Sequence, residues 1–263
     1  MRLGGMALRD GVLLQSERHW AAAVREADGS VRVVSGGKRS LPGRGLLQRV
    51  PLVRGLVRLG EALAVLPEVR RATGVPVLPH EDPRLLAATA ASAAAATTLR
   101  LGRRGSPLLR ELAAVGASFV PVLVALRDSR LARYHGAEHK SIAAFESGAP
   151  ATAAAREHER CGSNLLAPLA LTSLASALLL RAAGRERQPL ATLVAGLVSL
   201  GGAMEVFTWM ARHPDHPLAR LLRLPGVELQ RLVTTGEPTP EQLDVAQAAL
   251  EELLRLEGLA PAS

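Results

Sequence analysis

The chain has 263 residues, of which 48% are hydrophobic but only 2% aromatic, so alanine, leucine and valine supply most of the apolar content. This composition favours helices and excludes a large β-sheet. The formal net charge is +8, and because Lys38 and Lys140 are the only lysines, arginine carries nearly all of it. Such a basic balance fits nucleic acid, an anionic membrane surface, or simply a genome that encodes arginine in place of lysine.

Three sequence features narrow the class of protein. The arginines form no stripe with interleaved aromatic residues, so we expect no nucleic-acid partner. Cys161 is the only cysteine, which excludes an internal disulfide framework. The first residues, MRLGGMALRDGVLLQSERH, contain no apolar run long enough for a signal peptide. We therefore expect the region around residues 134–148 to be cytoplasmic.

Residues 1–80 are expected to hold a small β-rich piece and an amphipathic helix. Residues 1–37 are β-like, and two short alternating runs flank Asp28-Gly29, which is a typical hairpin turn. From residue 46 to residue 71, apolar residues recur at helical spacing with arginines between them. Such a helix fits a membrane surface and a packed core equally well. We expect it to be bounded by two prolines, Pro51 and Pro67.

Four apolar stretches follow and form the expected membrane core, residues 81–212. They cover residues 84–99, 108–126, 162–180 and 189–211. Asp82 and Pro83 supply an N-cap and a first helical residue for the first stretch. A spanning helix needs about 20 apolar residues, and small residues, which membrane helices use for close packing, are frequent in all four. The alternative is a soluble bundle whose core helices are apolar on every side.

Four spans place both chain ends on one side of the membrane, together with the loop 127–161. More of the arginines lie on this side, so we expect an inner-membrane, multi-pass protein whose ends and loop are cytoplasmic. The last segment, residues 213–263, is expected to contain an amphipathic helix that Thr239 caps, with a capping box to Gln242. Pro240 is its expected first residue and Gly258 its stop. The predicted fold class is therefore mainly α: about four apolar membrane helices, a small N-terminal β-rich piece and a C-terminal amphipathic helix.

The stretch YHGAEHKSIAAFESG, residues 134–148, carries the clearest chemistry. We expect a helix over residues 129–147 that Gly148 ends. At about 100° per residue, four polar groups project from one face of this helix: His135, Glu138, His139 and Glu146. Leucine and isoleucine share the stripe, so these groups are expected to be buried. A divalent cation is the partner that suits buried imidazole and carboxylate.

The order His135, Glu138, His139 matches the HxxEH pattern of a class of zinc peptidases. Two histidines four residues apart can bind one Zn²⁺, and Glu138 is then the expected general base toward a bound water. Such enzymes take a third ligand from far downstream. Glu205 is the candidate, because an ionisable residue inside an apolar stretch is costly and indicates a functional role.

A second cluster lies just before the third apolar stretch. His158 and Cys161 stand three residues apart and can bind one metal together. Alternatively, Cys161 is a reactive thiol beside a histidine, which is a nucleophile pattern. Prolines break the other histidine pair, His213 and His216, which we interpret as part of a loop.

Several stretches resemble the YqhQ-like family, bacterial multi-pass membrane proteins of unknown function that are described as predicted metal-dependent enzymes. The matching stretches run through nearly the whole chain: GGMALRDGVLLQS, PLVRGLVRLGEAL, YHGAEHKSIAAFESG, HERCG, AMEVF and LPGVELQRLVTTGEPTPEQLDVAQAAL. The resemblance implies that the motif positions include His135, Glu138, His139, Glu146, His158, Arg160, Cys161 and Glu205. It implies a membrane protein with a metal site, but no substrate.

The leading hypothesis is a membrane-embedded metal-dependent enzyme, most simply a zinc hydrolase. His135 and His139 would bind the ion with either Glu205 or the pair His158 and Cys161. Arg160 is a candidate for polarising an acyl or phosphoryl oxygen, or for a structural role at a helix end. The alternative is a non-catalytic scaffold or assembly protein with a closed His/Cys site. Its partners would be the bilayer and a second protein or a second copy of the chain. A transporter with Glu205 as an ion site is a third option, which the absence of repeated spans disfavours.

Overall fold

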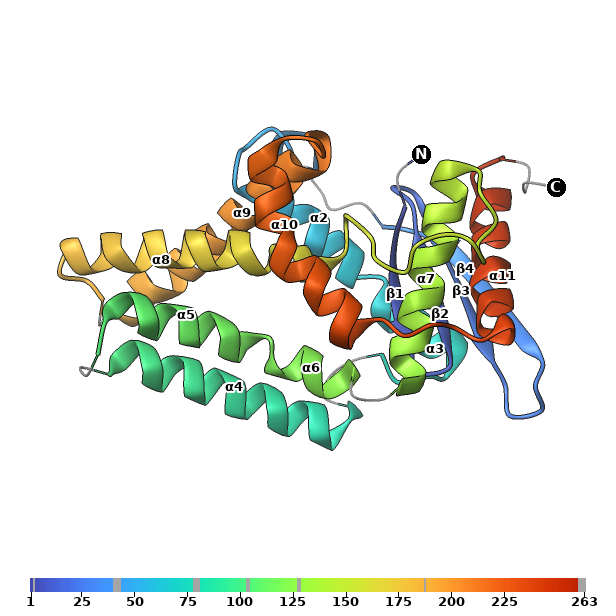
Figure 1. The fold of residues 1–263 in the computed structure, drawn as a ribbon, viewed down its shortest axis with the longest axis horizontal. Coiled ribbons are helices and arrows are strands. Elements are labelled where there is room, and N and C mark those ends of the chain that lie inside the picture. The colour runs from blue at the N-terminus through green and yellow to red at the C-terminus, as the bar shows by residue number, and fades with distance from the viewer. Residues whose placement is uncertain are drawn as a thin grey trace.

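Figure 1 shows a computed structural model of the protein, which describes residues 1, 3–39, 44–77, 81–102, 105–126, 129–186 and 188–259. One part is a small sheet with helices packed on it, and the other is a bundle of long helices that extends away from the sheet. The protein is mainly helical, as predicted, and its strands come from the N-terminal region.

The sheet has four antiparallel strands in chain order. They are β1 (Gly4–Leu8), β2 (Gly11–Gln15), β3 (His19–Arg25) and β4 (Val31–Gly37). The hairpin predicted around Asp28-Gly29 joins β3 to β4, and Gly29 has a φ of 87°, which glycine adopts without steric cost. The first hairpin, β1 to β2, was not individually predicted, because its turn at Arg9-Asp10 lacks glycine.

Successive side chains of a strand point to opposite sides of the sheet, and both sides of the central strands β2 and β3 are buried. Val12 and Leu14 pack against α7 (Ser129–Ser147) and α11 (Pro240–Leu256). Leu13 and Trp20 face the other way and pack against α3 (Leu66–Thr73). Segments from the beginning, middle and end of the chain therefore share one folded unit. The consecutive division expected from the sequence, into residues 1–80, 81–212 and 213–263, stays a prediction.

The amphipathic helix expected within residues 46–71, between Pro51 and Pro67, is present as α2 (Val53–Leu63). The shorter helix α1 (Arg44–Leu47) precedes it and α3 follows it. Pro67 lies in the first turn of α3, where its missing N–H costs nothing. Leu52, just before α2, has a φ of 68°, so the chain turns sharply there.

The bundle consists of two helical hairpins that lie along each other (Figure 1). One hairpin pairs α4 (Pro83–Leu101) with α5 (Pro107–Ser118) and α6 (Val120–Leu126), and the other pairs α8 (Leu166–Ala182) with α9 (Pro189–Arg212). The predicted cap is present, since the Asp82 side chain accepts the N–H of Arg84. Both hairpins turn at the end of the bundle farthest from the sheet.

Three segments among the described residues are long and apolar enough to cross a membrane: Pro107–Ala125, Gly162–Ala182 and Pro189–Arg212. Their leucines are unusually exposed, with Leu179 and Leu190 at 71% and 72%, as expected of surfaces that face lipid. The first predicted span, α4, is not among these three segments, because alanine and threonine make most of its length only weakly apolar.

The C-terminal helix α11 begins and ends as predicted, with a complete capping box between Thr239 and Gln242 and with Gly258 at a φ of 72°. Its apolar face packs on the sheet and on α7, which its sequence alone did not reveal. The helix α10 (Pro217–Leu229) and the π-type turn Gln230–Thr234 after it were not predicted. His213 and His216 lie in the loop between α9 and α10, as interpreted from the prolines.

Candidate metal centre

The helix α7 extends over Ser129–Ser147 as predicted, and Gly148 ends it with a φ of 71°. Its Tyr134, Ala137 and Ile142 side chains enter the core beneath the sheet. This packing fixes the rotation of the helix, so the neighbouring positions 135, 138 and 139 are held in place. His139 is 1% exposed and Glu138 is 4% exposed, so these two of the four polar groups are buried as expected, whereas His135 is partly buried and Glu146 is exposed.

Backbone carbonyls orient both imidazoles of α7. The Nδ1 atom of His135 lies 2.7 Å from the carbonyl oxygen of Thr234, and Nδ1 of His139 lies 2.6 Å from that of Arg156. A carbonyl oxygen only accepts, so each Nδ1 carries the hydrogen and donates it. In a neutral imidazole the Nε2 lone pair is then free, which is the arrangement that metal-binding histidines use.

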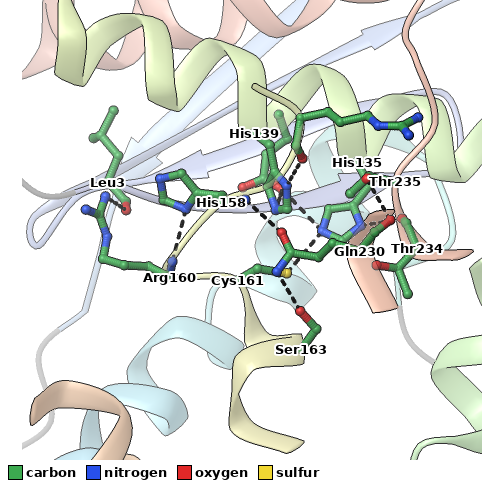
Figure 2. Close-up of polar contacts among 12 residues, drawn as sticks. Leu3, His135, His139, His158, Arg160, Cys161, Ser163, Gln230, Thr234 and Thr235 are labelled. Carbon is green, nitrogen blue, oxygen red and sulfur yellow. Dashed lines mark hydrogen bonds and ion pairs between the residues drawn. The ribbon is translucent and has the colours of Figure 1, made fainter. Parts of the chain in front are cut away.

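The sulfur of Cys161 completes a group of three possible ligands. His135 Nε2, His139 and Cys161 Sγ offer ligand atoms that all lie within 4.8 Å of one another, and Figure 2 shows the three side chains converging. The Cys161 sulfur is 3.6 Å from His135 Nε2. In a tetrahedral zinc site with Zn–N of about 2.05 Å and Zn–S of about 2.3 Å, nitrogen and sulfur are separated by about 3.6 Å. The spacing therefore fits a shared ion.

Glu138 lies beside both imidazoles. Its Oε2 atom is 3.9 Å from Nε2 of His135 and 3.9 Å from Nε2 of His139. Burial raises the pKa of this carboxyl to about 7, although the charge of His135 acts in the opposite direction. Gly5 of β1 leaves room for the group, since a Cβ there would lie 2.5 Å from Glu138 Oε1.

His158 lies next to this group but is engaged elsewhere. Its ring centroid is 5.6 Å from that of His139. Its Nδ1 accepts the backbone N–H of Arg160 at 3.3 Å, and its Nε2 lies 3.5 Å from Glu146. Burial, reinforced by the His139 and Arg160 charges, lowers the pKa of His158 to about 4. A neutral His158 with both nitrogens occupied has no lone pair directed at the three ligand atoms.

Arg160 and Glu146 form an ion pair that ties the segment 158–161 to α7. Arg160 bonds to both carboxylate oxygens of Glu146 and donates to the carbonyl of Leu3 at 3.4 Å. Burial raises the pKa of Glu146, but the hydrogen bonds and charge of Arg160 outweigh it, so the pKa lies below the usual value. The structure therefore gives these two predicted site residues a contact that positions Cys161.

Glu205 is not brought to the three-ligand group. Its carboxylate pairs with both ends of the Arg54 guanidinium from α2 and accepts the N–H of Leu52 at 3.1 Å. The sequence reasoning that made it a third ligand assumed that an acidic residue in an apolar helix needs a metal. In the structure an arginine meets this need.

Several groups that build the site carry little signal in the sequence. The carbonyls of Thr234 and Arg156 are backbone atoms, so no side-chain pattern could identify them. Gln230 accepts the N–H of His158 at 2.7 Å and donates to Ser163 at 2.9 Å. The stretch TTGEP covers residues 234–238. It approaches α7 closely at Gly136, where a Cβ would lie 2.0 Å from the Gly236 oxygen.

Comparisons with known proteins find relatives of unknown function over the residues described above. A family model described as "Protein of unknown function (DUF1385)" matches residues 118–256, which include α7, Cys161 and Thr234. The uncharacterized protein YqhQ of Bacillus subtilis (strain 168) is 27% identical over 305 aligned residues, covering 97% of this chain and 93% of that protein. No solved structure matches.

Proposed function

Because the chain belongs to the DUF1385 family, whose function is unknown, we propose an activity from its own geometry: a membrane-anchored, zinc-dependent hydrolase. The ligands are His135, His139 and Cys161. One observation carries this proposal, namely the convergence within 4.8 Å of two imidazole nitrogens and a thiol, with each imidazole fixed through its Nδ1 atom. Two nitrogens and one sulfur form a donor set that suits Zn²⁺.

Three protein ligands leave the fourth tetrahedral position open, as in catalytic rather than structural zinc sites. The closed His/His/His/Cys alternative needs a lone pair from His158, and both nitrogens of that ring have other partners. When bound, zinc would act as a Lewis acid and lower the pKa of a coordinated water. His135 and Cys161 are only partly buried, so a small molecule can approach the open side.

Glu138 is the proposed proton acceptor. Its carboxylate lies close to both ligand nitrogens, and a pKa of about 7 is the value at which a carboxyl exchanges protons most readily at neutral pH. The Glu138 side chain packs closely against Gly5 of β1, which keeps its carboxylate beside the two imidazoles. Arg160 is bound to Glu146, so its proposed role is to position the segment that carries Cys161.

The bilayer is the proposed partner, and the sheet, α7 and α11 are proposed to lie on its cytoplasmic side. Both hairpins leave from the sheet and return to it (Figure 1). This path supports having both chain ends on the cytoplasmic side. It holds even though α4 is less apolar than the other helices. A thiolate ligand also persists better in the reducing cytoplasm. Cys161 directly precedes the apolar segment Gly162–Ala182, so the proposed site would lie at the membrane boundary.

A cysteine nucleophile is the second candidate, because the 3.6 Å contact between Cys161 Sγ and His135 Nε2 also suits proton transfer from a thiol to an imidazole. The carbonyl of Thr234 orients that imidazole in the same way in either case. The two candidates differ in whether the thiol is occupied by a metal.

Cobalt substitution tests the proposal and separates the candidates. Cobalt-loaded protein is expected to show a thiolate-to-cobalt charge-transfer band that Cys161→Ser abolishes, and ligand-field bands of a site with three protein ligands and water. Glu138→Gln is the matched control and should keep the band. Rapid alkylation of Cys161 that added zinc does not slow would instead favour the nucleophile.

A further inference from the structure

A cavity lies between the two helical hairpins. It is near the end of the bundle at which both hairpins turn (Figure 1). Its volume is about 420 Å³, within the range of about 300–1,000 Å³ that is typical of ligand pockets. Its walls come from α4, α5, α8 and α9, and the described lining combines leucines, alanines and glycines with serines, a threonine and charged residues. It shares no residue with the His/Cys site.

Arginines surround the mouth of this cavity. Arg100, Arg110 and Arg181 all line it. Arg100 is neutralised by Glu111, which accepts from its Nε and Nη2 atoms. Within the described part of the chain, Arg110 and Arg181 form no ion pair, and the buried Nε of Arg110 has no hydrogen-bond partner. A guanidinium that is left unsatisfied in a partly buried position calls for an anion.

The lining of the cavity carries more positive than negative charge. Among the described residues that line it, three are arginines and two are glutamates, Glu111 and Glu186. The local excess of positive charge therefore favours a phosphate over a neutral or cationic headgroup.

The cavity runs most of the way through one leaflet of a bilayer. It extends along α9 from Thr192 near the turn to Ser199, and along α8 from Arg181 to Ser173. At 1.5 Å per residue these segments rise about 10 Å and about 12 Å, and half of a hydrocarbon core of about 30 Å is about 15 Å. The charged mouth would then lie at the headgroups and the apolar end near the midplane.

We propose that this cavity binds one anionic phospholipid of the bilayer, with its phosphate held by Arg110 and Arg181 and one acyl chain extending between the hairpins. The inference depends on the membrane placement of these helices and not on the metal. A lipid in this position fills the space that the two hairpins leave between them. It therefore adds contacts between the hairpin α4–α5 and the hairpin α8–α9.

Native mass spectrometry of the detergent-purified chain tests the proposal. The protein is mixed with equimolar phosphatidylglycerol and phosphatidylcholine of identical acyl chains, and lipid adducts are counted. We expect one phosphatidylglycerol per chain, preferred over phosphatidylcholine by at least about tenfold, since hydrogen bonds to charged groups are among the strong ones. An excess of inorganic phosphate should leave the adduct in place, because the acyl chain contributes to binding.

Two variants and two controls locate the site. Replacing Arg110 and Arg181 together by glutamine should abolish the preference for the anionic lipid, whereas Arg9→Gln, in the exposed turn between β1 and β2, should not. Gly196→Leu should remove both lipids, because Gly196 lines the cavity and a Cβ there meets nothing within 4 Å. Gly116→Leu, equally unobstructed but outside the cavity, is the matched control.

Three results would overturn the assignment. They are equal binding of the two lipids by the wild type, full retention of lipid by Gly196→Leu, and displacement of the adduct by phosphate alone. Zinc content is measured on the same samples. All four variants should leave the zinc content unchanged, so a failure of the lipid site is distinguished from a failure of the metal site.

Discussion

Glu138→Gln should stabilise the metal-free protein at neutral and alkaline pH while removing hydrolysis. The folded state raises the pKa of Glu138 from 4.5 to about 7 because the carboxyl is buried. A rise of about 2.5 pH units corresponds, at 1.36 kcal/mol per unit, to about 3 kcal/mol as an upper limit. The glutamine amide has nearly the same shape but no charge to bury.

The sign of the effect follows from proton linkage. A raised carboxyl pKa contributes stability that is fully present below the unfolded value near 4.5 and is lost as pH rises through about 7. Wild type and variant should therefore differ by a constant amount below about pH 4.5, and the variant should gain on the wild type up to about pH 7 and then level off. Added zinc should shrink this gain, since a divalent cation stabilises the neighbouring carboxylate.

The assay is thermal unfolding in detergent after removal of metal, as a pH series for both proteins. Zinc affinity is measured alongside and should change little if Glu138 is not a ligand. Any hydrolytic activity found for the wild type should fall by about 10²–10⁴-fold. Identical pH profiles for the two proteins would refute the buried ionisable carboxyl, and loss of zinc from the variant would make Glu138 a ligand rather than a base.

Further predictions concern packing, acid stability and membrane attachment. Gly5→Ala should cost about 1–3 kcal/mol by overpacking, because its Cβ would lie 2.5 Å from Glu138 Oε1, whereas Gly4→Ala meets nothing within 4 Å and should be nearly neutral in calorimetry. Burial raises the pKa of Glu257, but hydrogen bonds from Ser16, His19 and Arg18 outweigh this effect and lower the pKa to about 2. Its stabilising effect is thus present above about pH 4.5 and lost toward pH 2, and Glu257→Gln should unfold at lower temperature than wild type at pH 7 but not at pH 2. Membranes washed with alkaline carbonate should retain the chain, and its release would contradict the spanning reading of the three apolar segments.

The helices and their ends were largely predictable from the sequence, because they depend on local chemistry. Asp82-Pro83, Gly148 and the Thr239–Gln242 box all act within one turn of the chain. The contacts between distant segments were not predictable. Nothing in the sequence of α11 indicates that it packs on strands more than 200 residues earlier.

The candidate site was predictable in its residue types and only partly in its membership. The helical spacing of His135 and His139 was sufficient to place both rings on one side of α7. The choice between Cys161, His158 and Glu205 depends on long-range geometry that spacing does not contain. Glu205 forms an ion pair with Arg54, and His158 contacts Glu146. Each of these pairings joins residues from different elements.

Metal content tests the central claim most directly. Wild-type protein purified in detergent without chelators is measured by inductively coupled plasma mass spectrometry beside Cys161→Ser, His139→Ala and Glu205→Gln. The account predicts about one zinc per chain in the wild type, retention in Glu205→Gln, and loss in the other two, with Cys161→Ser as the mildest structural change. Absence of zinc from the wild type after exposure to the metal, or its full retention in Cys161→Ser, would contradict the three-ligand centre.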